Sequence, residues 1–504
     1  MTTCARSLVS LVVLSALPAL SACSRTDERT PHVSALRIGV PVPPSAGGAS
    51  GVPNVIGLLT TESLIINTTD GRPAERLAKS WAWNADHTVL HIELRQGVLF
   101  HDGTPLTPDV VADSVRRAVA DQNGLALASV KRIETTPAGI DIVLPAPDTF
   151  LLDDLGVLPI TRPDTPAVGT GPYKLLNSGA TATLAAFDKY YKGTPNIQSI
   201  TVSSYPTQRN AWAALMRSDI DMLQEVSPEA LDFVAAESAV RAYSFPKPYY
   251  YVLAFNVRHP ILSNVEVRRA INEAIDKNGI VAEGLHGRAR PASDPIWPEF
   301  WAASPEKGIQ FDPVAADRRL ESAGYTVKPG DATHPPGRIR INCLVWADDS
   351  RLTRTALMLQ KQLDAVGINL VLQPVPLKQL VPQIRTGQFD MFLFEMANAR
   401  TLSFVYMFWH SPRSDAPTFN FTGYTAADAS LDAIRAATSD DEIRKQTAAL
   451  QDVFASDPPA VFLAWQTMTR AVSTKFTVPP QPARDIIYSI WQWKPSDGRQ
   501  FAER

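Results

Sequence analysis

Cysteine is scarce in this chain: the 504 residues include three, at positions 4, 23 and 343. Cys4 lies inside an N-terminal apolar segment and Cys23 directly follows that segment, so the folded body is left with Cys343 alone. No intrachain disulfide can then stabilise the body. Its stability must come from a large apolar core, which a chain of this length with 45% hydrophobic residues can form.

A dominant charge and a long apolar run in the body of the chain are also missing. Lys and Arg number 48, Asp and Glu number 51, and both signs are spread along the sequence for a net charge of −3. Nucleic-acid-binding proteins usually carry a basic face, so we expect no nucleic-acid partner. No apolar run after residue 22 reaches the roughly 20 residues that a membrane-spanning helix needs.

The short motifs of common enzyme classes are absent as well. The sequence contains no G-x-S-x-G, H-E-x-x-H, C-x-x-C, Walker or dinucleotide-binding pattern, and its eight histidines are scattered. We therefore expect no catalytic residue, no metal site and no cofactor. Hydrolases that use two carboxylates need no such motif. A secreted lipoprotein hydrolase is thus an alternative, and a ligand sensor for a membrane kinase is another.

The N-terminus has the features of a secretion signal. Residues 1–22 carry one charged side chain, Arg6, ahead of an uncharged apolar stretch that is too short to span a bilayer. The tetrapeptide LSAC, which ends at Cys23, resembles the lipobox of bacterial lipoproteins. This resemblance implies cleavage before Cys23, a lipid on that cysteine, and residues 23–33 as a polar tether. An ordinary signal-peptide cleavage site is the alternative.

Helix and strand signals alternate along the rest of the chain. The alternating apolar residues of SALRIGVPVPP, from Ser34, predict a strand before a loop. Helical stripes are predicted after capping boxes at Ser263 and Ser439, and between Leu352 and Gly367. The apolar INLVLQPV that follows Gly367 predicts a strand. This alternation predicts an α/β fold with largely buried strands.

The adjacent pair His101 and Asp102 looks like an acid/base site but has a structural interpretation. It follows an alternating run at 89–94 that predicts a strand, and Asp102 with the next glycine forms a tight-turn dipeptide. Thr107 is a good helix N-cap, and a proline suits the first helical position after it. Catalysis would also need an orienting partner and a nucleophile, and neither is nearby. The pair is predicted to be structural.

This stretch and four others resemble one protein family. LAKSWAWNADHTVLHIELRQGVLFHDGTPLTPDVV, from Leu77, is similar to the signature of the extracellular solute-binding proteins of peptide and nickel ABC importers, often called family 5. VGTGPYKL, AFNVRHPILSNVEVRRAINEAIDK, DPVAADRRLESAGY and LQKQLDAVGINL agree in the same order. The resemblance covers nearly the whole mature chain. It implies capture of a small organic solute, such as a peptide, modified peptide or sugar, and its delivery to the permease subunits of an ABC importer.

The resemblance also implies a fold and a location. Family members have a periplasmic-binding-protein-like α/β fold of two lobes, with two hinge crossings and an extra subdomain in the first lobe (cluster C type). On this chain lobe I would comprise 34–247 plus 471–504, with the added subdomain at 55–165, and lobe II would comprise 248–470. The crossings would fall near PKPYYYVLAF and FLAWQTMTRAV. A monomeric, extracytoplasmic protein anchored to the membrane by lipid is implied.

The family's site for a peptide amino terminus is altered here. Peptide-binding members use an aspartate in the loop after a strand like QFDMFLFEMANARTL, where this chain has Ala399 between Asn398 and Arg400. A free ammonium group would lack its usual carboxylate unless Glu395 replaces it. Guanidinium groups pair bidentately with carboxylate or phosphate. Arg400 therefore favours an acidic or carbonyl-rich ligand, and a solvent-facing Arg400 is the alternative.

The family's site for a peptide carboxylate is altered too. Where dipeptide-binding members place an arginine, this chain has Trp346, with Arg351 five residues later. Both charged anchors of a zwitterionic peptide are thus missing, so we expect no preference for unmodified dipeptides. Trp346, Trp409 and the tyrosines Tyr249, Tyr250 and Tyr251 are predicted to line an aromatic cleft, with core packing as the alternative for each. His410 alone is too little to predict nickel binding.

Overall fold

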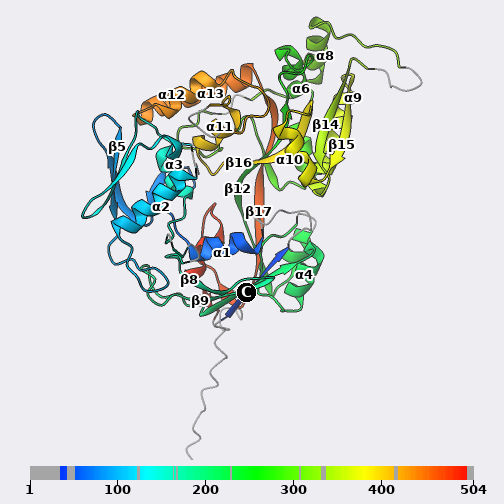
Figure 1. Cartoon of the computed structure of the whole chain (residues 1–504). Coiled ribbons are helices and arrows are strands. Elements are labelled where there is room, and N and C mark those ends of the chain that lie inside the picture. The colour runs from blue at the N-terminus through cyan, green and yellow to red at the C-terminus, as the bar shows by residue number, and fades with distance from the viewer. Residues whose placement is uncertain are drawn as a thin grey trace, which may run out of the picture.

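The computed structural model describes residues 35–41, 51–121, 125–162, 164–165, 168–227, 230–305, 308–330, 337–413 and 418–496. Helices and strands alternate along them, so the predicted α/β class is confirmed (Figure 1). The predicted signal peptide, Cys23 and the tether lie outside the described residues.

One mixed sheet of eleven strands runs through the described part of the chain, and two long antiparallel strands join its halves. These are β12 (Val240–Phe255) and β17 (Ala460–Ser473), which lie side by side at the centre of Figure 1. Their register shifts between Pro246 and Tyr250. A register shift bends a strand locally. The two predicted crossings are this pair of strands, and the irregularity lies where they pass from one lobe to the other.

The first lobe is built on one end of this sheet. Its strands are β1 (Ala35–Pro41), β8 (Tyr173–Asn177), β9 (Thr181–Ala186), β10 (Ser199–Tyr205) and β11 (Met222–Leu223). Its helices are α1 (Val52–Thr60), α4 (Gln208–Met216), α5 (Leu231–Ala236) and the 3₁₀ helix η4 (Ile486–Gln492). The first and last described segments meet here, because β1, α1 and η4 share one apolar cluster that contains Trp493.

The second lobe is built on the other end. Its strands are β13 (Ala289–Pro291), β14 (Ile339–Trp346), β15 (Ile368–Val375) and β16 (Met391–Ala397). Its main helices are α6 (Val265–Glu273), α8 (Pro313–Ser322), α9 (Ser350–Asp364), α10 (Leu377–Arg385), α11 (Leu402–Trp409), α12 (Asp428–Arg435) and α13 (Asp440–Ser456). Successive residues of β12 point to opposite faces of this sheet. Tyr250 accordingly joins one buried cluster and Tyr251 joins another.

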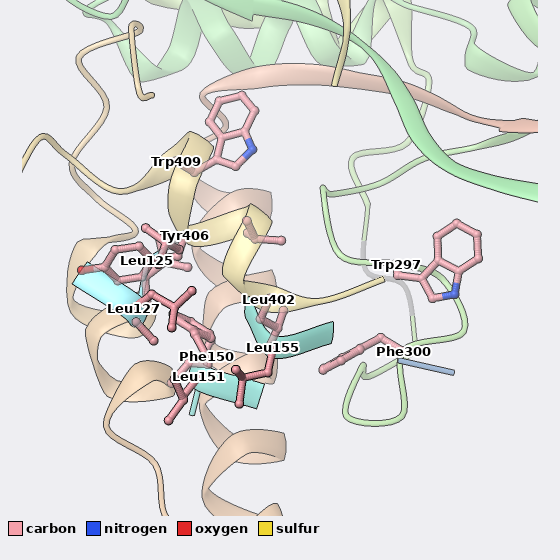
Figure 2. Packing of buried hydrophobic residues seen from close by; sticks show 14 of the residues in the cluster. Leu125, Leu127, Phe150, Leu151, Leu155, Trp297, Phe300, Leu402, Tyr406 and Trp409 are labelled. Atoms are coloured by element: carbon pink, nitrogen blue, oxygen red, sulfur yellow. The ribbon is translucent and has the colours of Figure 1, made fainter. Parts of the chain in front are cut away.

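A separate four-stranded antiparallel sheet, in the order β4-β5-β7-β6, is inserted in the first lobe. Its strands are β4 (Ala78–Trp83), β5 (Val89–Leu94), β6 (Arg132–Thr135) and β7 (Gly139–Val143), beside α2 (Pro108–Ala120), α3 (Leu151–Val157) and the hairpin of β2 (Ile65–Asn67) and β3 (Pro73–Glu75). Its apolar core continues into the second lobe (Figure 2). Phe150 packs edge-on against Tyr406 of α11, with ring centroids 5.4 Å apart. This inserted part is therefore docked on the second lobe.

Local signals locate most helix ends correctly. Ser439 caps α13 by accepting a hydrogen bond from the backbone of Glu442, as its capping box predicts. The strand predicted after Gly367 is β15, and Gly367 itself has a φ of 74°, which a glycine adopts at low cost. The box at Ser263 is wrong by one residue, because the side chain of Asn264 caps α6 instead.

Candidate functional site

A strained loop joins β16 to α11 beside the crossing strands. Ala399 and Arg400 both have left-handed backbones, with φ of 56° and 65°. Such conformations are costly outside glycine and cluster at functional sites. Asn398 fixes the loop, because its backbone N–H donates to the Pro248 carbonyl at 2.9 Å and its side-chain amide donates to the Pro295 carbonyl at 2.8 Å.

The Arg400 side chain lies beside the crossing strand β12 and has few partners. Its guanidinium makes one long hydrogen bond, 3.4 Å to the Pro246 carbonyl of β12, and lies 5.3 Å from the Trp297 ring centre. Its Nε is buried and has no partner among the described residues. Burial lowers the pKa of Arg400, and the nearby charge of Arg484 lowers it further. The guanidinium is therefore a poorly compensated positive charge.

Arg484 and Tyr488, from the C-terminal return of the chain, lie near Arg400. The Arg484 guanidinium is 5.4 Å from the Tyr488 ring centre and makes no hydrogen bond or ion pair with any described residue. Burial lowers the pKa of Arg484 and raises the pKa of Tyr488. Tyr488 is nevertheless 36% exposed. The sequence analysis singled out neither residue, because nothing in QPARDIIYS distinguishes them from other surface residues.

Glu395 lies at the crossing strands and already has protein partners. Its carboxylate accepts a hydrogen bond from Gln466 of β17 at 2.7 Å and lies 3.7 Å from the Lys247 ammonium. Lys247 in turn lies 4.2 Å from the ring centre of Tyr249. These contacts tie β12, β16 and β17 together at the register shift. Glu395 is thus compensated without a ligand ammonium.

Arg351 is also paired within the protein. Its guanidinium lies 2.9 Å from Asp349, the N-cap of α9, and 3.4 Å from Glu225, which follows β11 of the first lobe. Burial by itself would raise the pKa of Asp349, but Arg351 lowers it below the usual range. Arg351 therefore bridges the lobes. Trp346, at the end of β14, is half-buried and packs against Phe394 with ring centroids 5.8 Å apart.

Three of the predicted ligand contacts are closed off by protein in this structure. Trp409 is 0% exposed and Tyr250 and Asn398 are each 1% exposed. The Trp409 indole N–H donates to the Tyr250 hydroxyl at 3.1 Å. These two aromatic residues form part of the core beneath the sheet, and Asn398 supports its loop from within. The apolar character that suggested a cleft is the same character that drives core packing.

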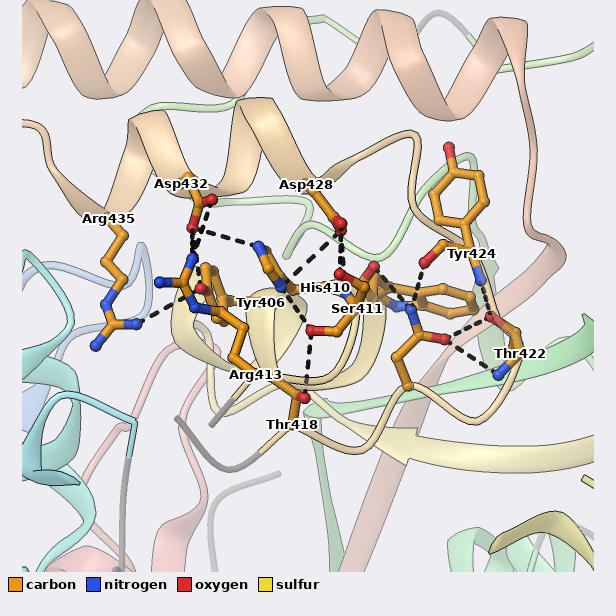
Figure 3. Close-up of polar contacts among 12 residues, drawn as sticks. Tyr406, His410, Ser411, Arg413, Thr418, Thr422, Tyr424, Asp428, Asp432 and Arg435 are labelled. Atoms are coloured by element: carbon orange, nitrogen blue, oxygen red, sulfur yellow. Dashed lines mark hydrogen bonds and ion pairs between the residues drawn. The ribbon is translucent and has the colours of Figure 1, made fainter. Parts of the chain in front are cut away.

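His410 belongs to a polar network at the end of α11 (Figure 3). Its ring stacks on Tyr406 at 4.3 Å and lies 3.3 Å from the Asp432 carboxylate. Asp432 also pairs with Arg413 at 3.1 Å, and Asp428 accepts the Ser411 backbone N–H at 2.9 Å. Within the described ranges no group of His, Cys, Asp and Glu has the arrangement of a metal site.

The predicted turn at His101 and Asp102 is confirmed. Asp102 accepts hydrogen bonds from the backbone N–H and hydroxyl of Thr104, at 2.9 and 2.6 Å. Thr107 caps α2, as predicted. His101 Nε2 lies 3.0 Å from the Gly171 carbonyl, and burial lowers the pKa of the ring. The neutral ring therefore donates Nε2–H to that carbonyl and joins two loops.

Replacing His101 with alanine should accordingly destabilise the fold and leave ligand binding unchanged. The variant loses the bond to Gly171 and the edge-to-face contact with Phe187, so we expect a loss of about 1–3 kcal/mol in urea unfolding. Replacement of His91, whose side chain is 52% exposed, is the matched control and should change stability little. A loss of solute affinity at unchanged stability would contradict the structural role.

Solved structures share the two-lobe architecture. NikA from Brucella suis, solved with Fe(III)-EDTA, superposes with a TM-score of 0.79 at 20% identity, covering 92% of this chain and 100% of that one. AgaA from A. tumefaciens R10, solved with agropinic acid, has a TM-score of 0.74 at 22% identity, covering 92% and 99%. This chain therefore belongs to the class of two-lobe α/β folds that these proteins share.

Sequence comparisons identify the family within that class. The pattern described as bacterial extracellular solute-binding proteins, family 5 Middle, matches residues 72–416. The glutathione-binding protein of Pectobacterium atrosepticum is 24% identical over 433 residues, 80% of this chain and 82% of that protein. The heme-binding protein A of Haemophilus influenzae is 25% identical over 339 residues, 56% and 61% of the two chains. This chain belongs to the family 5 extracellular solute-binding proteins.

No helix in the described part of the chain is long and apolar enough to cross a membrane.

Proposed function

We propose that this protein captures one small organic solute between its lobes and delivers it, chemically unchanged, to the permease subunits of an ABC importer. The observation that carries the proposal is the pair of strands β12 and β17, which join the two ends of the sheet and shift register between Pro246 and Tyr250. Hinges of this kind absorb the motion of lobes that close around a ligand. Membership in the family supports the same role.

We further propose the boundaries of the lobes and the residues that contact the solute. Lobe I comprises residues 34–247 and 471–504, with the added subdomain at 55–165, and lobe II comprises 248–470. The solute would contact Arg400 and Trp346 of lobe II, and Arg484 and Tyr488 of lobe I. Support comes from the accessibility of Trp346 and Tyr488 and from the few protein partners of Arg400 and Arg484. Glu395 and Arg351 are left out of the contact set, because both are paired within the protein.

Lipid attachment at Cys23 is part of the proposal and rests on the sequence LSAC. Replacing Cys23 with alanine should release the protein from the membrane, because no second anchor is expected. Detergent partitioning of the wild type and the variant measures this directly. A Ser24 variant is the matched control and should stay with the detergent phase. Equal partitioning of the Cys23 variant would contradict lipid anchoring.

The solute class is tested by thermal-shift screening across dipeptides, sugars, polyamines and metal chelates. A solute at a hundred times its dissociation constant stabilises the folded state by about 2.7 kcal/mol. We expect the solute found by the screen not to be an unmodified dipeptide. Ala399 stands where an aspartate would bind the peptide ammonium group, and Trp346 stands where an arginine would bind the peptide carboxylate. Tight saturable binding of a plain dipeptide would contradict that specificity. Hydrolysis of a hit would favour the hydrolase alternative instead.

A further inference from the structure

A cavity of about 240 Å³ lies where the inserted part of the first lobe docks on the second lobe. The inserted part contributes Trp83, His87 and Asp153 to its walls, and the second lobe contributes Trp301 and Leu402. None of the solute contacts proposed above is among its lining residues. Because a cavity of about 150 Å³ is enough to hold benzene, this one has room for a small organic molecule.

Aromatic rings form two of the cavity walls. On one side the rings of Trp83 and His87 are stacked, with centroids 5.9 Å apart, and on the other lies Trp301. All three residues are half-buried. The face of such a ring attracts a cation, and the guanidinium of Arg72 already lies 3.9 Å from the centre of the Trp301 ring. The walls are therefore suited to a positively charged ligand.

The charged residues of the cavity leave one carboxylate without a cation. Arg72 pairs with Asp440 at 2.9 Å, and Asp148 pairs with Arg435 at 2.7 Å. Asp153, by contrast, forms no ion pair with any described residue. The cavity is thus lined by one negative charge more than the neighbouring arginines neutralise.

The Asp153 carboxylate is poorly stabilised by the protein. In the described part of the chain its hydrogen-bonding partner is Ser403, whose backbone N–H donates to it at 3.4 Å, a long contact. Burial, and then the nearby carboxylate of Asp154, raise the pKa of Asp153 to about 8. A cation in contact with a carboxylate favours its charged form. A bound cation would therefore supply the compensation that the surrounding side chains do not.

We propose that this cavity is a second ligand site, which takes a small organic cation with its ammonium or amidinium group at Asp153 and its apolar body between the aromatic walls. The inference does not depend on the importer role, because the cavity is separate from the proposed solute contacts. Its walls come from both the inserted part and the second lobe, so a cation bound there stabilises the docking of one on the other.

Benzamidine, benzamide and benzoate test the charge preference, because they share one shape and carry a positive, zero and negative charge. They are compared by titration calorimetry of the purified protein above pH 8, where the Asp153 carboxyl is charged. We expect benzamidine to saturate at one per chain, and the other two to bind at least about tenfold more weakly. No saturable binding of benzamidine, or equal binding of benzamide or benzoate, would overturn the inference.

The variant Asp153→Asn locates the site. It should fold as stably as the wild type in urea unfolding, because it removes a poorly stabilised charge, and bind benzamidine at least about tenfold more weakly. Asp232→Asn is the matched control, because the Asp232 side chain is 97% exposed, and it should keep the wild-type affinity. Unchanged affinity in Asp153→Asn would overturn the inference. Should that variant not fold, the order of the three probes on the wild type still decides.

A competition experiment separates this site from the proposed solute site. Wild-type protein saturated with a solute from the thermal screen should still bind one benzamidine per chain. Loss of benzamidine binding under these conditions would place the probe in the solute site and overturn the inference, while leaving the proposed function standing.

Discussion

Replacing Glu62 with alanine is expected to lower the free energy of unfolding by about 3–5 kcal/mol, because it leaves a buried cation unpaired. Glu62 is 1% exposed and lies 3.2 Å from the guanidinium of Arg76, whose side chain is 14% exposed. The hydroxyls of Tyr190, Tyr191 and Thr170 donate to the same carboxylate at 3.1 to 3.2 Å. One substitution therefore removes the acceptor of four groups that come from three segments of the chain.

Equilibrium urea unfolding measures this loss, and Glu75 provides the control. Glu75 also pairs with an arginine, Arg95, at 3.4 Å, but its side chain is 59% exposed. Surface ion pairs contribute little, so Glu75→Ala should cost less than about 1 kcal/mol. Equal losses for the two variants would show that the buried network is not what joins these segments.

Replacing Trp409 with alanine should cost about 3–5 kcal/mol, the usual cost of removing a large aromatic side chain from a core. Trp409 is fully buried, and its ring centroid lies 5.2 Å from that of Phe462 and 6.2 Å from that of Phe454. Its loss also leaves the Tyr250 hydroxyl without the indole donor. The cavity that remains is apolar and enclosed, so the packing is lost without replacement.

Solute affinity distinguishes this core role from the cleft role that the sequence suggested. We expect the folded Trp409 variant to bind a solute from the screen as tightly as the wild type does. Phe233→Ala is the control, because Phe233 is 69% exposed. This variant should change neither stability nor affinity appreciably. A large affinity loss with little change in unfolding free energy would return Trp409 to the binding site.

Local signals predicted local structure well. The strand at 89–94, the cap at Thr107 and the strand after Gly367 depend on neighbours within a few residues, and the structure has all three. The capping box at Ser263 was misplaced because Ser263 and Asn264 are both good caps, and only the local backbone selects between them. Such ambiguities cannot be resolved by residue type.

The site was only partly predictable, because its contacts join distant parts of the chain. Arg400 was predicted from its own loop, but its neighbour Arg484 returns from the C-terminal segment. No pattern in the sequence indicated that Arg351 forms an ion pair with the other lobe, but packing places Glu225 3.4 Å from its guanidinium. An arginine's availability depends on which carboxylates the fold brings to it. The order of residues along the chain does not show which carboxylate will pair with which arginine.

We propose that the protein binds one solute and returns it unchanged. Isothermal titration of the purified protein with a solute selected by the thermal screen, followed by mass spectrometry of the recovered solute, tests it most directly. We expect saturation at one solute per chain, heat that ceases at saturation, and a solute of unaltered mass. Continuing heat after saturation together with a solute of altered mass would contradict it.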